Sequence, residues 1–390
     1  MQNELLLNWY LSAYCSQKLE KLQPPLADIL RIGAYQILFL DKVPDHAAVS
    51  ESVELCRTNG RSAASGLVNA VLRKIAQNKA NLPPLPKERT ARLSIAYSHP
   101  QWLVKKLISL VGAEEAEAFL RIDNEAAPLS VQLNPLKTSE AALTEELRGE
   151  GVGVTPHAWV PGCLELSGTG DLTTLSAFYN GRFTVQDAAA RLVATVAAPR
   201  ETDRVLDVCA APGGKSFALA IDMQDKGDIL SCDVHPHKLK LIDNGAARLG
   251  LHSIRTALAD GRERHEAWIE QADLVVADVP CSGLGIIRKK PDIRYKNPKE
   301  LATLPREQRA ILENAAGYVR PGGTLIYSTC TVLPEENQEV VTWFLKAHPE
   351  FHLSPFVLPA PIGGCDGHLT LWPQRWGTDG FYICRLEKDK

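Results

Sequence analysis

The feature that most constrains the fold is an alternation of short apolar runs with helical stretches in the second half of the chain. Helical connections place successive strands parallel in one sheet, with helices on both of its faces. The pattern therefore predicts a doubly wound α/β domain of Rossmann-like type, in which ligands bind beyond the carboxyl ends of the strands. The strand-like runs lie at 204–209, 228–233, 254–259, 273–279 and 324–328.

The first 82 residues contain helical patterns and little strand signal, which predicts an all-α domain. Asp45 is the predicted N-cap of a helix that begins at His46. A proline-rich stretch at 82–86 is typical of a linker. One further helix is predicted from apolar residues that share a face, namely Leu67, Val68, Val71, Leu72 and Ile75.

The middle of the chain changes character near residue 128. Helices are predicted up to about residue 125, and a strand from Ser130 with a helix over 139–147 then predicts a small α+β subdomain. We therefore expect three parts: an all-α domain over 1–82, a helical linker with the α+β subdomain over 88–182, and the Rossmann-like domain over 183–390.

Composition restricts the class of protein and the cellular compartment that we expect. The 390 residues carry a net charge of −3, so a nucleic-acid partner would need a local basic patch. Nine cysteines without a Cys-x-x-Cys pair argue against a disulfide scaffold and against a zinc ribbon. The first residues lack the basic start of a signal peptide, and no run approaches the roughly 20 apolar residues of a membrane span. We expect a cytoplasmic monomer without a membrane segment or a metal.

The run at 204–209 opens into a glycine-containing turn, Ala-Ala-Pro-Gly-Gly-Lys-Ser. Gly213 and Gly214 allow close approach of a ligand to the backbone and the start of a helix. A phosphate-binding loop would need glycine at position 209, which is Cys209, and the dinucleotide pattern G-x-G-x-x-G also fails. A ligand with an amino-acid end fits better, because Lys215 and the loop amides could meet its carboxylate. A purely structural turn is the alternative.

Two acidic residues follow the next strand-like runs. Asp233 ends the second run, where a carboxylate accepts hydrogen bonds from a ribose diol in nucleotide-binding sheets. Asp260 follows the third run and could accept from an adenine amino group. A solvated strand end is the alternative for Asp233, and a turn aspartate before Gly261 is the alternative for Asp260.

Two cysteines stand in short motifs after the last two parallel strand-like runs. Cys281 lies in Asp-Val-Pro-Cys-Ser-Gly, close to Asp278, and Cys330 lies in Tyr-Ser-Thr-Cys-Thr. A thiolate that attacks carbon-6 of cytosine makes carbon-5 nucleophilic, and a second thiol can assist the later release. A neutral Asp278 could donate to ring nitrogen-3. Each cysteine alone is better explained as a buried structural thiol, and only their pairing favours chemistry.

A cationic segment follows the first thiol motif. Residues 288–296 carry five cations and one anion. This composition suits phosphate contacts, and a solvated charged loop is the alternative. The predicted RNA contacts are Arg288, Lys289, Lys290 and Arg294.

Together these motifs resemble the RNA 5-methylcytosine methyltransferases, specifically the RsmB (Fmu) type that acts on small-subunit ribosomal RNA. The front of the chain, at 30–49 and 65–73, resembles the NusB-like RNA-binding domain of the same family, with a start one or two helices later than usual. The catalytic half carries the resemblance at 206–215, 278–283, 287–293, 328–337 and 380–382.

The resemblance implies a ribosomal RNA partner and S-adenosylmethionine as cofactor. It also implies that Cys330 is the nucleophile and that Cys281 releases the product. The implied cofactor residues are Cys209, Ala210, Ala211, Pro212, Gly213, Gly214, Lys215, Asp233, Asp260 and Asp278.

Three other functions compete with this interpretation. The first is methylation of cytosine in another RNA, such as tRNA. The second is methylation of a protein or small molecule, which has no use for two thiols and commonly has an Asn/Asp-Pro-Pro-aromatic motif in place of Asp-Val-Pro-Cys. The third is a non-catalytic RNA-binding assembly factor, which leaves the glycine turn unexplained.

Overall fold

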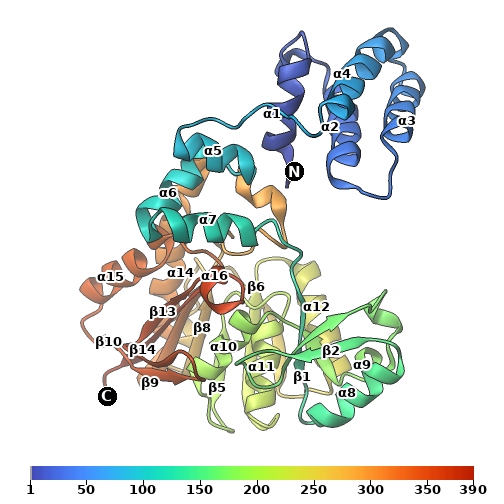
Figure 1. Cartoon of the computed structure of the whole chain (residues 1–390). Coiled ribbons are helices and arrows are strands. Elements are labelled where there is room, and N and C mark those ends of the chain that lie inside the picture. The colour runs from blue at the N-terminus through green and yellow to red at the C-terminus, as the bar shows by residue number, and fades with distance from the viewer. Residues whose placement is uncertain (1) are drawn as a thin grey trace. The chain divides into compact units, whose positions relative to one another are not determined.

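The computed structural model describes residues 2–390, and its chain divides between Glu125 and Ala126 into two compact units (Figure 1). No helix in this described range is long and apolar enough to cross a membrane. The same range contains no cluster of His, Cys, Asp or Glu suited to hold a metal ion. Each unit is described in turn.

The N-terminal unit is helical throughout its described residues. The shared apolar face predicted near residue 70 is confirmed, since Val68, Val71, Leu72 and Ile75 are buried. The predicted cap is wrong by one position: Pro44 is the N-cap and Asp45 is the first helical residue. The helices are α1 (Glu4–Tyr14), α2 (Pro24–Phe39), α3 (Asp45–Thr58), α4 (Ser65–Gln77), α5 (Arg89–Ala96), α6 (Gln101–Val111) and α7 (Ala113–Ile122), with short 3₁₀ turns η1 (Leu19–Lys21) and η2 (Ser62–Ala64).

The C-terminal unit begins with a small antiparallel sheet in the order β2-β3-β1-β4. Its apolar side chains, including Val131, Leu164 and Phe183, form a core with α8. The predicted α+β character is therefore confirmed. The elements are β1 (Leu129–Leu133), α8 (Glu140–Gly149), β2 (Gly153–Pro156), β3 (Cys163–Ser167), η3 (Leu172–Thr174), α9 (Ser176–Tyr179) and β4 (Phe183–Val185).

The large sheet follows, in the order β10-β14-β9-β8-β5-β6-β7, with β13 paired to β14. All five predicted parallel strands are present, but β10, β13 and β14 run antiparallel, so the sheet is mixed rather than wholly parallel. The strands are β5 (Arg204–Asp207), β6 (Asp228–Asp233), β7 (Ile254–Leu258), β8 (Ala272–Asp278), β9 (Val319–Thr329), β10 (Phe351–Leu353), β13 (His368–Leu371) and β14 (Phe381–Lys388). A separate hairpin joins β11 (Phe356–Leu358) and β12 (Gly363–Cys365).

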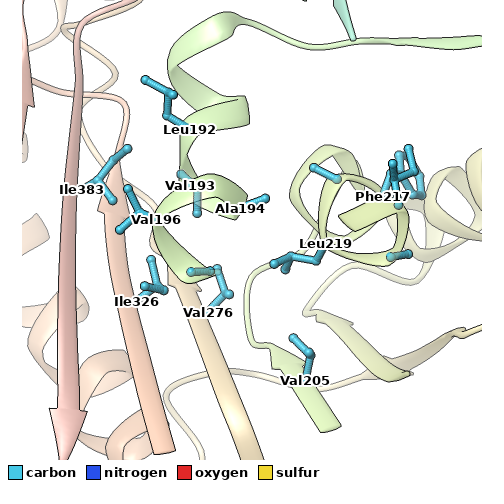
Figure 2. Close-up of a cluster of buried hydrophobic side chains, with 14 of the residues drawn as sticks. Leu192, Val193, Ala194, Val196, Val205, Phe217, Leu219, Val276, Ile326 and Ile383 are labelled. Atoms are coloured by element: carbon cyan, nitrogen blue, oxygen red, sulfur yellow. The ribbon is translucent and has the colours of Figure 1, made fainter. Parts of the chain in front are cut away.

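Helices cover both faces of this sheet, because successive strand residues point to opposite sides and both sides are apolar. Val205 and Val276 face one core with α10 (Ala188–Ala197), α11 (Gly214–Asp222) and α12 (Pro236–Leu249), part of which Figure 2 shows. Leu206 and Val275 face a second core with α14 (Leu304–Tyr318) and α15 (Gln338–Ala347). The remaining short helices are α13 (Pro298–Leu301), α16 (Pro373–Trp376), η4 (Glu266–Trp268), η5 (Pro291–Tyr295) and η6 (Pro334–Glu336).

The strand order places the candidate residues at one edge. The chain runs outward from β5 through β6 and β7, then returns to the other side of β5 with β8 and β9. The crevice at such a reversal is where open α/β sheets bind ligands. The carboxyl ends that meet there carry Asp207, Asp233, Asp278 and, just beyond β9, Cys330.

Candidate active site

The two thiols lie in contact. β8 and β9 are adjacent and parallel, with Asp278 opposite Ser328, so the segments that leave these strands run side by side. The Sγ atoms of Cys281 and Cys330 are 3.3 Å apart. The sequence prediction that these motifs converge at one sheet edge agrees with this geometry.

The thiols differ in acidity. Either sulfur can donate in this contact, but a hydrogen bond from Cys281 stabilises the Cys330 thiolate and lowers the pKa of Cys330. Burial and the Asp278 carboxylate oppose this effect, and the nearby Lys215 ammonium supports it. The same hydrogen bond, together with burial, raises the pKa of Cys281 well above its ordinary value. Cys330 is therefore the thiol of the pair that ionises first. Thiolate is the nucleophilic form of cysteine.

Asp278 stands beside the thiols with both oxygens occupied. Its Oδ2 is 2.6 Å from Nζ of Lys215, and its Oδ1 accepts a hydrogen bond of 2.7 Å from the Ser328 hydroxyl. Burial lowers the pKa of Lys215, but the Asp278 carboxylate outweighs this and the net pKa is raised. Both Asp278 oxygens accept hydrogen bonds in this arrangement, and the expected donation from a neutral Asp278 to a ring nitrogen stays a prediction. Lys215 is the proton-bearing group here.

The glycine turn has the backbone shape that its sequence predicts. Gly213 has φ +110°, a conformation that favours glycine, and a Cβ there would lie 2.4 Å from the Phe217 ring. Gly214 begins α11. The Ala210 amide donates to the Cys232 carbonyl of β6, which holds the turn across the ends of two strands. Cys209 is half-buried, and the burial of its thiol raises its pKa, which is typical of an unreactive cysteine.

The lysine of the turn has a protein partner, and its contact with a ligand stays a prediction. Lys215 was expected to meet a ligand carboxylate, yet its side chain is paired with Asp278 and lies 5.2 Å from the centre of the Phe381 ring. The side chain therefore joins the cofactor turn to the thiol site. The sequence contains both residues, but their pairing depends on the approach of β5 and β8.

The two acidic strand-end residues, Asp233 and Asp260, differ in whether their carboxylates are available to bind a ligand. Asp233 uses Oδ1 to accept from the His235 amide at 2.9 Å, while its Oδ2 makes no hydrogen bond within residues 2–390. The next side chain, Val234, is 49% exposed and provides an apolar surface that the sequence analysis missed. Asp260 instead holds the Arg262 guanidinium at 2.6 Å, a hydrogen bond that lowers the pKa of Asp260. Its role as a ligand for adenine stays a prediction.

Sequence reasoning also missed a buried anchor behind the thiols. Glu336 is 1% exposed, and its Oε2 accepts from the Ser282 amide and from the Gln308 side chain, both at 2.8 Å. The Ser282 hydroxyl donates to Thr331 at 2.7 Å. These bonds tie the segment that carries Cys281 to the segment that follows Cys330. Two consecutive glutamates after a proline were the only sequence signal.

The expected strip of free cations differs from the structure. The Arg288 side chain is 7% exposed and lies 3.4 Å from Asp379. Lys289 is paired with Asp187 at 2.8 Å and with Asp379 at 2.6 Å, and Arg294 is buried. Anions from distant parts of the chain thus pair with Arg288 and Lys289, and Arg294 donates a hydrogen bond to the Pro291 carbonyl. Only Lys290 is exposed without such a pairing, and its RNA contact stays a prediction.

A Rossmann-like sheet with this glycine turn, and with an acidic residue at the next strand end, defines a class: the Rossmann-like methyltransferases. Comparison with known proteins agrees. Residues 194–387 match the model of the 16S rRNA methyltransferase RsmB/F family, residues 1–77 match the NusB family, and residues 99–173 match the ferredoxin-like domain of RsmF/B-like methyltransferases. The chain belongs to the RsmB family of ribosomal RNA small subunit methyltransferases, as its motifs predicted.

Individual relatives span nearly the whole chain. The probable ribosomal RNA small subunit methyltransferase B of Bacillus subtilis is 37% identical over 402 aligned residues, which cover 100% of this chain and 88% of the relative. Its counterpart from Synechocystis is also 37% identical and covers 94% of this chain and 84% of the relative. The crystal structure of PH0851 is 30% identical with a TM-score of 0.85, over 99% of this chain and 87% of that one.

A fourth comparison supports the fold alone. The structure of NSun6 from Pyrococcus horikoshii with SFG has a TM-score of 0.67 at 23% identity, and covers 75% of this chain and 98% of that one. The predicted fold class is confirmed: a NusB-like helical domain, a small α+β subdomain and a Rossmann-like methyltransferase domain.

Proposed function

We propose that this enzyme methylates carbon-5 of cytosine in small-subunit ribosomal RNA through a covalent bond between Cys330 and carbon-6 of the base. The observation that carries the proposal is the thiol pair, in which the Sγ atoms of Cys281 and Cys330 are 3.3 Å apart. An enzyme that transfers a methyl group to a nucleophilic oxygen or nitrogen has no need of such a pair. The names of the RsmB relatives support ribosomal RNA as the substrate.

The proposed cofactor is S-adenosylmethionine, and the residues at the sheet edge fit it. The glycine turn opens into the N-terminus of α11 at Gly214, the free Oδ2 of Asp233 suits a ribose diol, and exposed Val234 suits the face of an adenine ring. The backbone of residues 209–215, together with Asp260 and Asp278, completes the proposed site. When bound, S-adenosylmethionine supplies an electrophilic methyl group.

The chain's own groups perform the remaining steps. The Cys330 thiolate forms a bond to carbon-6, and the electron pair of the carbon-5–carbon-6 double bond moves into the ring. The Lys215 ammonium stabilises the charge that develops there, as a positioned cation does in a water-poor site. Carbon-5 then takes the methyl group.

The bond between Cys330 and carbon-6 breaks when the methylated RNA is released. The proton on carbon-5 leaves, the carbon-5–carbon-6 double bond forms again, and the sulfur of Cys330 departs as thiolate. Cys281 lies near enough to assist. Bonding of Cys330 to carbon-6 removes the charge that held the Cys281 proton. Cys281, which is partly exposed, can then release that proton to solvent, and its thiolate accepts the carbon-5 proton.

The test is bisulfite sequencing of small-subunit ribosomal RNA from a strain that lacks this protein. Reintroduction of the wild-type gene should restore one or more methylated cytosines, and Cys330→Ala should not. With purified protein, Cys281→Ala should accumulate an RNA adduct that resists denaturation, because release fails. An adduct formed by Cys330→Ala would exchange the roles of the thiols. Identical bisulfite patterns in the deletion and wild-type strains would refute the ribosomal substrate and favour another RNA.

A further inference from the structure

Gln186 connects β4 to α10, and its side-chain amide is buried without a partner. The residue is 6% exposed, and neither Nε2 nor Oε1 has a hydrogen-bond partner among residues 2–390. Its backbone is held by a hydrogen bond from its amide to the Ser130 carbonyl. A buried amide that lacks hydrogen bonds is destabilising, so such a group calls for an explanation.

The amide faces the cofactor turn. The position that a Cβ would take on Gly214 lies 3.4 Å from Nε2 and 3.8 Å from Cδ of Gln186. Gly214 is the first residue of α11, a helix of nine residues. The first N–H groups of a helix have no partner within it and attract anions. The unpartnered amide and these N–H groups therefore converge on the same place.

Lys215 leaves this place without a side-chain cation. Its Nζ is 2.6 Å from Asp278 and so is directed to the thiol site. A ligand carboxylate at the start of α11 would thus depend on helix N–H groups and on a neutral donor. Gln186 is the neighbouring side chain that can act as this donor.

We propose that Gln186 Nε2 donates a hydrogen bond to the carboxylate at the amino-acid end of S-adenosylmethionine, while the N-terminus of α11 binds the same group. The inference rests on the proposed cofactor site and names one of its binding residues. Gln186 is well placed for this role because the next residue, Asp187, is fixed: its carboxylate caps α10 through the Ala189 amide and holds Lys289.

A different explanation is a water molecule. Gln186 also lines a cavity of about 240 Å³ between the small sheet and the helices α10 and α11, together with Gln132 and Thr184. A polar cavity of this size can hold water that would satisfy the amide. The two explanations differ in whether Gln186 contributes to binding of the cofactor's amino-acid end.

Calorimetry with two nucleosides separates them. S-adenosylhomocysteine has the amino-acid end, whereas 5′-methylthioadenosine shares the adenosine and thioether but lacks that end. Gln186→Leu should weaken the binding of S-adenosylhomocysteine about ten- to a hundredfold, the loss expected for one hydrogen bond to a charged group. The affinity for 5′-methylthioadenosine should stay unchanged. Thr184→Val, which removes a buried polar group from the same cavity, should alter neither affinity.

Two further measurements sharpen the test. The ligand-free Gln186→Leu protein should unfold at a temperature no lower than wild type, since the change removes an unpaired amide. Gln186→Glu should bind S-adenosylhomocysteine more weakly than Gln186→Leu, because its charge repels a carboxylate. Tighter binding by Gln186→Glu would place the amide against the ligand's ammonium group and overturn the assignment.

The remaining outcomes are equally decisive. Unchanged affinity of Gln186→Leu for S-adenosylhomocysteine, or an equal loss for both nucleosides, would overturn the inference in favour of a water-filled cavity or a general packing role. A wild-type protein that binds neither nucleoside would instead refute the proposed cofactor, and the inference with it.

Discussion

Removal of the Cys281 thiol should make Cys330 a weaker acid. In the structure the two Sγ atoms are 3.3 Å apart, and a hydrogen bond from Cys281 to the ionised Cys330 is the main reason that the pKa of Cys330 is lowered. A hydrogen bond to an ionised group contributes about 1.5–3 kcal/mol, and each 1.4 kcal/mol is a factor of ten. Cys281→Ala should therefore reduce the thiolate population of Cys330 at neutral pH by about ten- to a hundredfold.

The assay is alkylation by iodoacetamide across a range of pH, with the rate at Cys330 read by peptide mass spectrometry. Cys330 is partly exposed, so the reagent can reach it. The rate in Cys281→Ala should fall at neutral pH and approach the wild-type rate at alkaline pH, where both proteins hold the thiolate.

Cys281→Ser is the matched control, because a hydroxyl can still donate and should preserve most of the rate. The reasoning would be refuted by a Cys330 in Cys281→Ala that reacts as fast as wild type, or faster, at neutral pH. That result would mean that the proton of the pair rests on Cys330.

Three other outcomes follow from the site. Asp233→Ala should weaken the binding of S-adenosylhomocysteine about ten- to a hundredfold in calorimetry. Asp260→Ala should weaken binding less, because Asp260 is already paired with Arg262. A larger loss for Asp260→Ala would contradict the assignment of Asp233 to the ribose. Lys289→Met should lower the free energy of unfolding in urea by about 3 kcal/mol, because Asp187 and Asp379 stay buried without their cation. Lys290→Ala should leave the free energy of unfolding unchanged and reduce the salt slope of RNA binding by up to about 0.7–0.9. Equal stabilities of the two variants would refute the assignment of Lys289 to the interior and Lys290 to RNA. A protein that starts at Ala126 should fold and bind S-adenosylhomocysteine but methylate folded RNA poorly; full activity would remove a recognition role from the N-terminal unit.

Local patterns in the sequence determined the large sheet and the position of its site. The apolar runs that become β5 to β9 are recognisable one at a time, because a buried strand needs only a few consecutive apolar residues. Once the strands are known to be parallel, their carboxyl ends must meet at one edge. The meeting of Cys281, Cys330 and Asp278 follows from that rule alone.

The antiparallel strands of the large sheet could not be predicted from local sequence patterns. The run that becomes β14 has an ordinary strand composition, and nothing near it indicates that it inserts between β9 and β10. Its direction depends on which edge of the sheet is open after β9, and this is a property of the assembled domain.

Tertiary structure alone decided what the charged side chains do. Sequence composition marks Arg288 and Lys289 as a cationic loop, yet their partners Asp187 and Asp379 come from positions about a hundred residues before and after it. Lys215 is likewise separated from Asp278 by 63 residues. A charge near the surface gains little from one neighbour over another until burial removes water, and then the nearest opposite charge determines its role. Which charges become neighbours is set by the packing of strands and loops, and that packing has no signature within a single segment.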